Sequence, residues 1–401
     1  MPMSWALFIA AVLAAAGYLV GRGRAFSVAG PDVRDLHSRP VYHGAGVALL
    51  TLTPAVAVLV VAAVLRMTGI LTAEAGTLVG VFAIAASLAG LGWGVSRIGV
   101  GFKARNTVEA IVLGLLILCS TIAILTTAGI VLSMLFETGS FFRKYSWTDF
   151  FFGTEWTPRF QGNSRLGLLP LLWGTLYISL IALLVAVPIG LFAAIYMSEY
   201  ATRRVRAIAK PAIEVLAGIP TIVYGLFALI TVGPMLRDYF AQPLGLGNSG
   251  SSVLTAGLVM GIMLIPFVSS LSDDIINAVP QSLRDGALGL GSTPSETIRQ
   301  VVLPAALPGI VGAVLLAASR AIGETMIVVL GAGAAARMSL NPFEAMTTIT
   351  VKIVSQLTGD NDFAAPETLV AFALGLTLFV ITLGLNIVAL YIVRKYREQY
   401  E

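Results

Sequence analysis

The segment Asp285-Gly-Ala-Leu-Gly-Leu-Gly291-Ser-Thr293-Pro-Ser-Glu296-Thr-Ile-Arg-Gln-Val-Val-Leu-Pro304 is the most informative stretch of this sequence. Its second half carries a helix start signal: Thr293 can cap a helix, the proline after it suits the first helical position, and Glu296 completes a capping box. The residues before Gly291 can form a short helix that this glycine ends. The segment therefore predicts two short helices joined by a glycine turn, which form a rigid projection.

The composition on either side of this segment is that of a membrane protein. The chain has 401 residues, of which 57% are hydrophobic and 11% charged, whereas soluble domains carry about 45–50% apolar and about 25% charged residues. The net charge of +4 indicates no surface for binding nucleic acid or another polyanion. One cysteine and two histidines exclude an internal disulfide and leave little material for a metal site. These features predict an all-α polytopic membrane protein without a metal centre.

Nine stretches are long and apolar enough to cross a bilayer, which needs roughly 20 apolar residues per helix. The stretch 239–272 is too long for one span, and its start has a loop composition, so its helix is expected to begin near Val253. The predicted spans are 1–21, 44–65, 75–96, 110–136, 166–198, 215–236, 253–272, 305–333 and 368–393.

The distribution of basic residues predicts the orientation. With the N-terminus outside, the cytoplasmic segments hold 16 Lys and Arg and the outside segments hold 8, in agreement with the excess of positive charge that cytoplasmic loops carry. The C-terminus and the segment 273–304, which we call the coupling loop, are then cytoplasmic. The outside segment 137–165 is rich in aromatic residues, which suits either an aromatic belt at the membrane interface or a docking surface for an external protein.

The coupling loop resembles the EAA loop of ABC-importer permeases, whose pattern is Glu-Ala-Ala, three residues, Gly, nine residues, Ile, one residue, Leu-Pro. The spacing is the same throughout, with Asp285 and Gly286 in place of the first Glu and Ala, and Val301 in place of Ile. By this resemblance, the residues that contact an ATPase are Asp285, Gly286, Ala287, Gly291, Leu303 and Pro304.

Two further stretches are similar to the permeases of phosphate-specific importers, and the second of them is closer to the PstC-type than to the PstA-type subunit. They are Glu214-Val-Leu-Ala-Gly-Ile-Pro-Thr-Ile-Val-Tyr-Gly225 and Arg320-Ala-Ile-Gly-Glu324-Thr-Met326. The resemblance covers about residues 108–401, the six-span permease domain. Residues 1–107 then form a three-span N-terminal extension.

The resemblance implies a transporter of several subunits in the bacterial inner membrane. Its parts would be this permease, a second PstA-type permease, a PstB-type ATPase dimer and an external PstS-type phosphate-binding protein. The chain has no Gly-x-x-x-x-Gly-Lys-Ser/Thr motif, so ATP and Mg are expected on the ATPase and no cofactor or catalytic residue on this chain.

Ionisable residues inside a span are costly and are usually functional. Arg320 lies sixteen residues after Pro304, about 24 Å along a helix, and Glu324 would lie one turn further on the same face. This pair can form a structural salt bridge or an anion site that selects a protonated oxyanion. Glu214 is assigned to the substrate pathway as well, although an acid that opens a span also suits a helix N-terminus.

The sequence therefore predicts the permease subunit of an ATP-driven phosphate importer. One alternative is a permease of the same architecture for sulfate or molybdate. Another is a proton-coupled secondary transporter that uses Arg320 and Glu324. The coupling loop favours the ATP-driven class, because a secondary transporter has no reason to keep a cytoplasmic projection of this spacing.

Overall fold

Helices form almost all of the computed structural model, which describes residues 3–30, 32–71, 75–159, 163–359 and 365–397. Nine helices in these residues are long and apolar enough to cross a membrane, so the predicted all-α fold with nine spans is confirmed. They are Ser4–Ala29, Pro40–Met67, Gly76–Ser96, Ala104–Lys144, Leu169–Tyr200, Thr221–Ala241, Val253–Ala278, Pro294–Ile322 and Pro366–Lys395.

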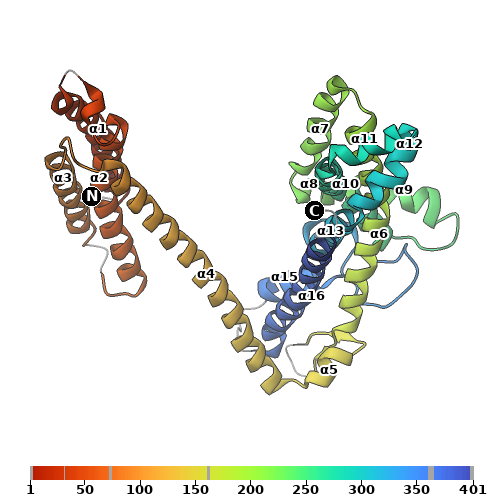
Figure 1. Cartoon of the computed structure of the whole chain (residues 1–401). Helices are drawn as coiled ribbons and strands as arrows, with labels where there is room; N and C mark the ends of the chain where they lie inside the picture. Colours follow the sequence, from red (N-terminus) through yellow and green to blue (C-terminus); the bar gives the residue numbers. More distant parts are fainter. Residues whose placement is uncertain (1–2, 31, 72–74, 160–162, 360–364, 398–401) are drawn as a thin grey trace. The chain divides into compact units, whose positions relative to one another are not determined.

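The chain divides into two units, Met1–Ala128 and Gly129–Glu401, and the division falls inside one helix, α4 (Ala104–Lys144). The sequence places the domain boundary somewhat earlier, at residue 107. Figure 1 shows α4 as the long helix that continues from the first unit into the second.

The first unit contains α1 (Met3–Ala29), a 3-10 turn (Val33–Asp35), α2 (Pro40–Met67), α3 (Gly76–Ser96) and the start of α4. Small residues let these helices approach closely, as is common between membrane helices. A Cβ on Gly90 of α3, for example, would lie 1.9 Å from the carbonyl oxygen of Leu50 in α2. The Ser38 hydroxyl, ahead of α2, accepts the Arg105 backbone N–H of α4 at 3.2 Å.

The second unit begins at its outer end with a short helix and a small hairpin. These are α5 (Trp147–Phe152), β1 (Trp156–Thr157) and β2 (Arg165–Leu166), which pairs antiparallel with β1. Next come α6 (Leu169–Ile195) with a π-helical turn (Tyr196–Tyr200), α7 (Arg203–Ala217), α8 (Thr221–Phe227), a π turn (Ala228–Val232), α9 (Gly233–Leu236) and a π turn (Arg237–Ala241). The rest consists of α10 (Val253–Ala278), α11 (Gln281–Gly289), α12 (Pro294–Thr297), a π turn (Ile298–Val302), α13 (Leu303–Ile322), α14 (Met326–Gly331), α15 (Ile349–Gly359) and α16 (Pro366–Arg397).

The centre of the second unit is α10, the most buried of its spanning helices. This helix begins at Val253, as the sequence predicts, with the Ser252 side chain as its N-cap. It packs against α6 through Gly257 and Gly261, which lie against the side chains of Ile181 and Val185. Because glycine has no side chain, the two helices can approach closely along this line.

The aromatic segment 137–165 builds a core of its own at the outer end of the unit. Phe141 and Phe150 are fully buried there in T-shaped contact, and Tyr145 stacks on Phe141. Trp147 and Phe152, by contrast, are 60% and 69% exposed. Part of the aromatic segment is therefore a packed core that supports the hairpin, and part is free to meet the membrane surface or another protein.

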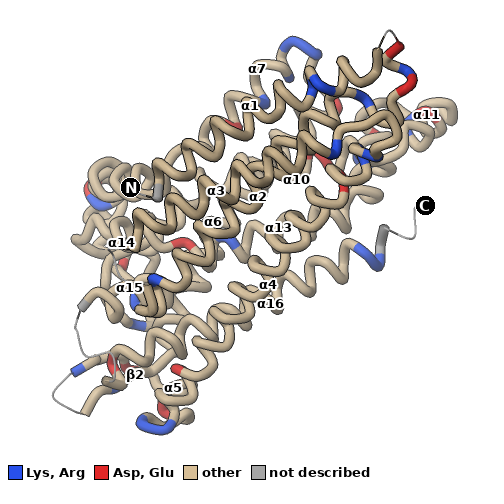
Figure 2. The backbone as a smooth tube through the Cα atoms, turned by 90° about the vertical axis from the view of Figure 1, so that its left-hand side faces the viewer, with Lys and Arg blue, Asp and Glu red and all other residues tan. Residues whose placement is uncertain are grey.

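Charged residues of the second unit gather near the two ends of its long helices (Figure 2). One group lies by α7 and α11 and the other by α5 and β2, so the segments 199–214 and 273–304 share one end and 137–165 lies at the opposite end (Figure 1). This separation is what a bilayer requires, because charges inside the hydrocarbon region are costly. It agrees with the predicted alternation of loops across the membrane.

Labelling of single cysteines tests which end faces outward. The background is Cys119→Ser, which removes the one native thiol. Ser146 and Ser295 are exposed residues at opposite ends of the second unit. An impermeant thiol reagent applied to intact cells should label Ser146→Cys and leave Ser295→Cys unlabelled until the cells are opened. Labelling of position 295 in intact cells would contradict the predicted orientation.

Candidate functional site

A cavity of about 290 Å³ lies between α7, the start of α8, α10 and α13 in the second unit. Its polar lining comes from Glu214, Thr221, Ser270 and Arg320. The apolar part of the lining is Ala217, Ile219, Met263, Pro266 and Phe267. Two of the three residues predicted for the substrate pathway, Glu214 and Arg320, therefore face the same space.

Arg320 lies two residues before the end of α13 and carries its charge without a carboxylate partner. Its guanidinium carbon is 5.7 Å from the centre of the Phe267 ring, which is cation–π geometry. In the part of the chain that the structure describes, Arg320 forms no ion pair. Its planar set of N–H donors is thus free to bind an oxyanion in the cavity.

Glu324 does not lie one helical turn beyond Arg320 on the same helix, so that geometric prediction was wrong. The helix α13 ends at Ile322 with Gly323 as its C-cap, and a new helix, α14, starts at Met326. The Glu324 carboxylate accepts a hydrogen bond from the Met326 backbone N–H at 3.1 Å. The backbone carbonyl oxygen of Glu324 accepts one from the Thr350 hydroxyl at 2.8 Å. Glu324 therefore supports the break between two helices and does not line the cavity.

Glu214 does not open a span, contrary to the sequence-based expectation. It lies in the last turn of α7, and the spanning helix starts afterwards at Thr221 with Pro220 as its N-cap. A negative charge at the carboxyl end of a helix opposes the helix dipole. Helix capping thus gives no reason for an acid at this position, whereas the lining of the cavity includes it.

A buried carboxylate that the sequence did not reveal fixes α7 in place. Asp273 of α10 is fully buried, and its oxygens accept Arg206 at 2.9 Å and Lys210 at 2.9 Å, both from α7. The hydrogen bond that Lys210 donates to Asp273 raises the pKa of Lys210. Because α7 has no buried residue of its own, these ion pairs to a buried carboxylate attach it to α10, together with the pair of Lys210 with Asp274 at 3.4 Å.

The coupling loop has the local structure that its sequence predicts. α11 ends just before Gly291, whose φ of +89° is a conformation that favours glycine. Thr293 and Glu296 form the full capping box: the Thr293 N–H donates to the Glu296 carboxylate at 2.8 Å, and the Glu296 N–H to the Thr293 hydroxyl at 3.3 Å. The second helix of the loop is not short, however, because it continues from Pro294 to Ile322.

The residues predicted to meet the ATPase lie on two parts of this loop. On α11, Asp285 and Gly286 are exposed and Ala287 is buried, and Asp285 accepts the Gln281 amide at 3.1 Å. Leu303 and Pro304 begin α13 after the π turn. Next to the first group, the side chains of Leu283, Leu288 and Leu290 are exposed, Leu290 to 91%, which suits a protein contact.

An ion pair that the sequence also did not reveal holds the base of the loop. Arg284 pairs with Glu199 from the end of α6 at 2.9 Å, and both side chains are nearly buried. The same guanidinium donates to the carbonyl oxygens of Ile276 and Val279 at the end of α10. Arg284 thereby satisfies the last carbonyls of α10 and fixes the angle at which α11 leaves it.

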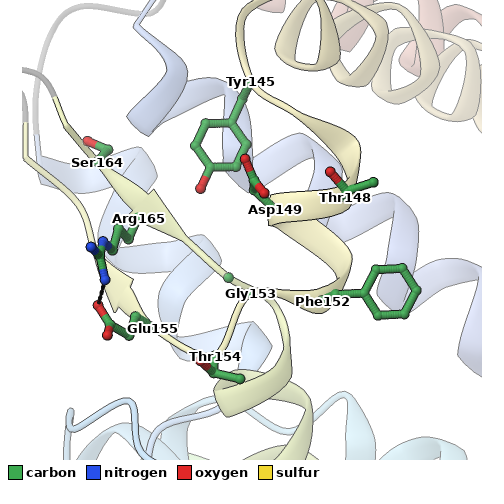
Figure 3. A pocket seen from close by; sticks show the side chains of 10 residues that line it. Tyr145, Thr148, Asp149, Phe152, Gly153, Thr154, Glu155, Ser164 and Arg165 are labelled. Carbon is green, nitrogen blue, oxygen red and sulfur yellow. Dashed lines mark hydrogen bonds and ion pairs between the residues drawn. The ribbon is translucent and has the colours of Figure 1, made fainter.

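A second hollow, of about 550 Å³, opens at the outer end of the unit between α5 and the hairpin. Figure 3 shows Asp149 and Thr148 on the helix side and Glu155 and Arg165 on the hairpin side, where the last two form an ion pair at 2.5 Å. The hairpin is also joined to the first turn of α16 by the Ser164 hydroxyl, which donates to the buried Glu367. This end of the unit is a pre-formed polar cleft.

Comparison with known proteins identifies the class to which this architecture belongs. The family described as "Binding-protein-dependent transport system inner membrane component" matches residues 186–398, more than half of the chain. The chain belongs to this family. A second family, described as "Phosphate ATP-binding cassette transporter", matches residues 7–76, which lie in the first unit.

Curated relatives narrow the comparison. The chain is 36% identical over 262 residues to "Phosphate transport system permease protein PstC" of Mesorhizobium japonicum, covering 62% of this chain and 78% of that protein. It is 37% identical over 281 residues to "PstC 1" of Mycobacterium tuberculosis, covering 61% of this chain and 81% of that protein. The resemblance to PstC-type permeases is thus confirmed.

Among solved structures, the chain is similar to the inward-facing methionine ABC transporter MetNI, with 18% identity and a TM-score of 0.42 over 56% of this chain and 93% of that one.

Members of this family are membrane subunits of ABC transporters and not enzymes, and they associate with an ATPase and a substrate-binding protein. The binding-protein-dependent permease is a multi-pass protein of the inner membrane. The second unit has an exposed loop at one end and a polar cleft at the opposite end, which suit these two associations.

Substitutions in the coupling loop test its contact with the ATPase. Gly291→Pro should abolish the turn, because proline cannot adopt a φ of +89°. Asp285→Lys should reverse the charge of an exposed contact residue. The backbone strain in Gly291→Pro costs about 1–3 kcal/mol. In both variants, co-purification of the ATPase and substrate uptake should each fall about ten-fold or more.

The matched control is Gly286→Ala, since nothing lies within 4 Å of a Cβ at this position. Alanine should strengthen α11 and keep ATPase binding. Normal uptake in both Gly291→Pro and Asp285→Lys would remove the loop from the mechanism.

Proposed function

We propose that this chain is one of the two membrane subunits of an ATP-driven phosphate importer and forms half of the translocation pathway. The family match, the PstC relatives and the coupling loop support an ABC phosphate permease. The substrate enters from the outer end, passes the cavity that Glu214 and Arg320 line, and leaves at the end where the coupling loop lies.

The observation that carries this proposal is the unpaired Arg320. An arginine inside a membrane-spanning segment is costly and is usually functional, and Arg320 lies in the last turn of the span Pro294–Ile322. A salt bridge would offset this cost, but within the described residues no carboxylate pairs with Arg320. The guanidinium instead opens into the cavity, where a tetrahedral oxyanion can accept two of its N–H donors at once.

The remaining parts of the transporter are other proteins. We assign a PstA-type permease as the second half of the pathway, a PstB-type ATPase dimer at the coupling loop and a PstS-type phosphate-binding protein at the outer cleft. ATP and Mg bind to the ATPase, and this chain needs no cofactor. The N-terminus is placed outside and the C-terminus in the cytoplasm, in accordance with the charge asymmetry of the loops.

Purification of the intact assembly from native membranes separates this function from its rivals. An ATPase and a second permease should accompany the chain, together with phosphate-dependent uptake in vesicles made from the same membranes. A sulfate or molybdate permease would bring the same kinds of partner but would transport a different ion. A proton-coupled secondary transporter would purify without an ATPase.

Arg320→Lys tests the role of the guanidinium. Lysine keeps the positive charge but loses the planar fork that binds two oxygens at once, so the initial rate of phosphate uptake should fall about ten-fold or more while the complex still assembles. The control is Arg337→Lys, because Arg337 is 54% exposed and lies outside the cavity. Unchanged uptake in Arg320→Lys would show that Arg320 does not touch the ion.

A further inference from the structure

Two opposite charges face the same cavity, and neither is neutralised by an ion pair. Glu214 enters from α7 and Arg320 from α13, and both line the cavity of about 290 Å³. No ion pair within 4.0 Å joins them or involves either side chain in the described part of the chain. Two hydroxyls, those of Thr221 and Ser270, complete the polar lining.

The separation of these charges leaves room for a ligand between them. The cavity far exceeds the roughly 10–15 Å³ that one water molecule requires, so it can hold a small oxyanion with part of its hydration. A cation alone would attract any oxyanion. A carboxylate that faces the same cavity adds a second requirement, because it repels a ligand that brings only negative oxygen atoms.

Ion pairs between α7 and α10 hold Glu214 at the cavity. The buried Asp273 of α10 binds Arg206 and Lys210, which lie two turns and one turn before Glu214 on α7. Phe267, also on α10, lies against the Arg320 guanidinium. The same helix, α10, therefore orients both charged residues.

We propose that Glu214 is the carboxylate that makes this cavity select a protonated oxyanion. The Arg320 guanidinium donates to the deprotonated oxygens of phosphate, and a Glu214 oxygen accepts the hydrogen bond of the P–OH group. No proton is transferred, and the ion leaves in the protonation state in which it entered. The inference rests on the proposed function and names the residue that gives its substrate preference.

The chemistry of the competing anions explains the preference. Near neutral pH, phosphate still carries at least one proton, whereas sulfate and molybdate carry none. A site built to receive a hydrogen bond rejects an analogue that lacks the donor, and here an ionised Glu214 would also repel the bare dianion. Glu324, the acidic residue of the stretch 320–326, does not line the cavity, and its carboxylate accepts the Met326 backbone N–H instead.

Glu214 also lines a second cavity, of about 410 Å³, together with Arg203, Arg206 and Lys210. This cavity lies along α7, toward the end of the unit where the coupling loop is found. Glu214 is thus the one acidic residue that borders both of these hollows.

The experiment compares anion binding by the purified complete membrane complex, without the external binding protein, because that protein selects the ion beforehand. Equilibrium binding of radiolabelled phosphate is measured with sulfate as the competitor. Glu214→Gln should lower the preference for phosphate over sulfate about ten- to a hundred-fold, the worth of a charge-assisted hydrogen bond. Glu214→Asp, which keeps the charge, should retain part of the preference.

Two further variants are measured in the same way, one as a control and one as a test of a rival residue. Asp238→Asn removes an exposed carboxylate that pairs with Arg237 and lines neither cavity, and it should keep the wild-type preference. Glu324→Gln tests the rival residue. An unchanged preference in Glu214→Gln, or a loss in Glu324→Gln alone, would overturn the inference, as would a wild-type complex that binds no phosphate.

Uptake by vesicles that hold the complete importer and its external binding protein separates this inference from the proposed function. If the wild-type importer takes up phosphate and Glu214→Gln keeps its anion preference, the inference fails and the proposed function stands. If the wild-type importer takes up no phosphate, the proposed function itself fails, and the inference fails with it.

Discussion

The buried carboxylate of Asp273 is the contact on which the site and its connection to the coupling loop both depend. An isolated charge cannot remain in a membrane protein interior without partners, and Asp273 obtains them from Arg206 and Lys210 of α7. Removing one partner of a buried ion pair typically costs about 3–5 kcal/mol. Because α7 contributes no buried residue, the position of Glu214 depends on the polar contacts of α7. These are the ion pairs with Asp273 and, nearer to Glu214, the hydrogen bond from the Tyr224 hydroxyl to the Leu216 carbonyl oxygen.

The same helix that holds Asp273 also carries the base of the coupling loop. α10 ends at Ala278, and Arg284 binds the carbonyl oxygens near that end while it pairs with Glu199 of the preceding span. The last one and a half turns of α10 therefore contact both α7, which bears Glu214, and the coupling loop. A displacement of the loop cannot leave α7 unaffected unless one of these buried ion pairs breaks.

Local sequence signals predicted the elements whose formation depends on adjacent residues. The start of α10 at Val253 and the capping box at Thr293 are examples, because a loop composition and a three-residue spacing decide them. The end of α13 was missed because the apolar sequence resumes at Met326, directly after the short interruption by Gly323, Glu324 and Thr325. The Asp273 and Glu199 ion pairs join residues 63 to 85 positions apart, and no local pattern reports such distances.

The misplacement of Glu324 shows why this difference matters for function. An i, i+4 relation in the sequence puts two side chains on one face only if the helix continues through both, and here a glycine ends it between them. The pairing of charges across the cavity is set instead by tertiary packing of α7 against α10, which brings Glu214 from more than a hundred residues away. If Glu214 selects the ion as we propose, selectivity in this unit is a property of helix packing and not of the short motif around Arg320.

One continuous helix connects the coupling loop to the ion site. The span Pro294–Ile322 starts at the capping box in the loop and has Arg320 in its last turn, a distance of about 39 Å along its axis at 1.5 Å per residue. Hydrogen-bonded backbone transmits a push along this length without side-chain relays, apart from the π turn Ile298–Val302, where the helix can bend. In the importer that we propose, movement of the loop against the ATPase would shift the guanidinium directly, while Glu214 would follow through Asp273. Because the two charges are driven by separate contacts, the gap between them can change during the cycle, which is what a site must do if it binds an ion in one state and releases it in another.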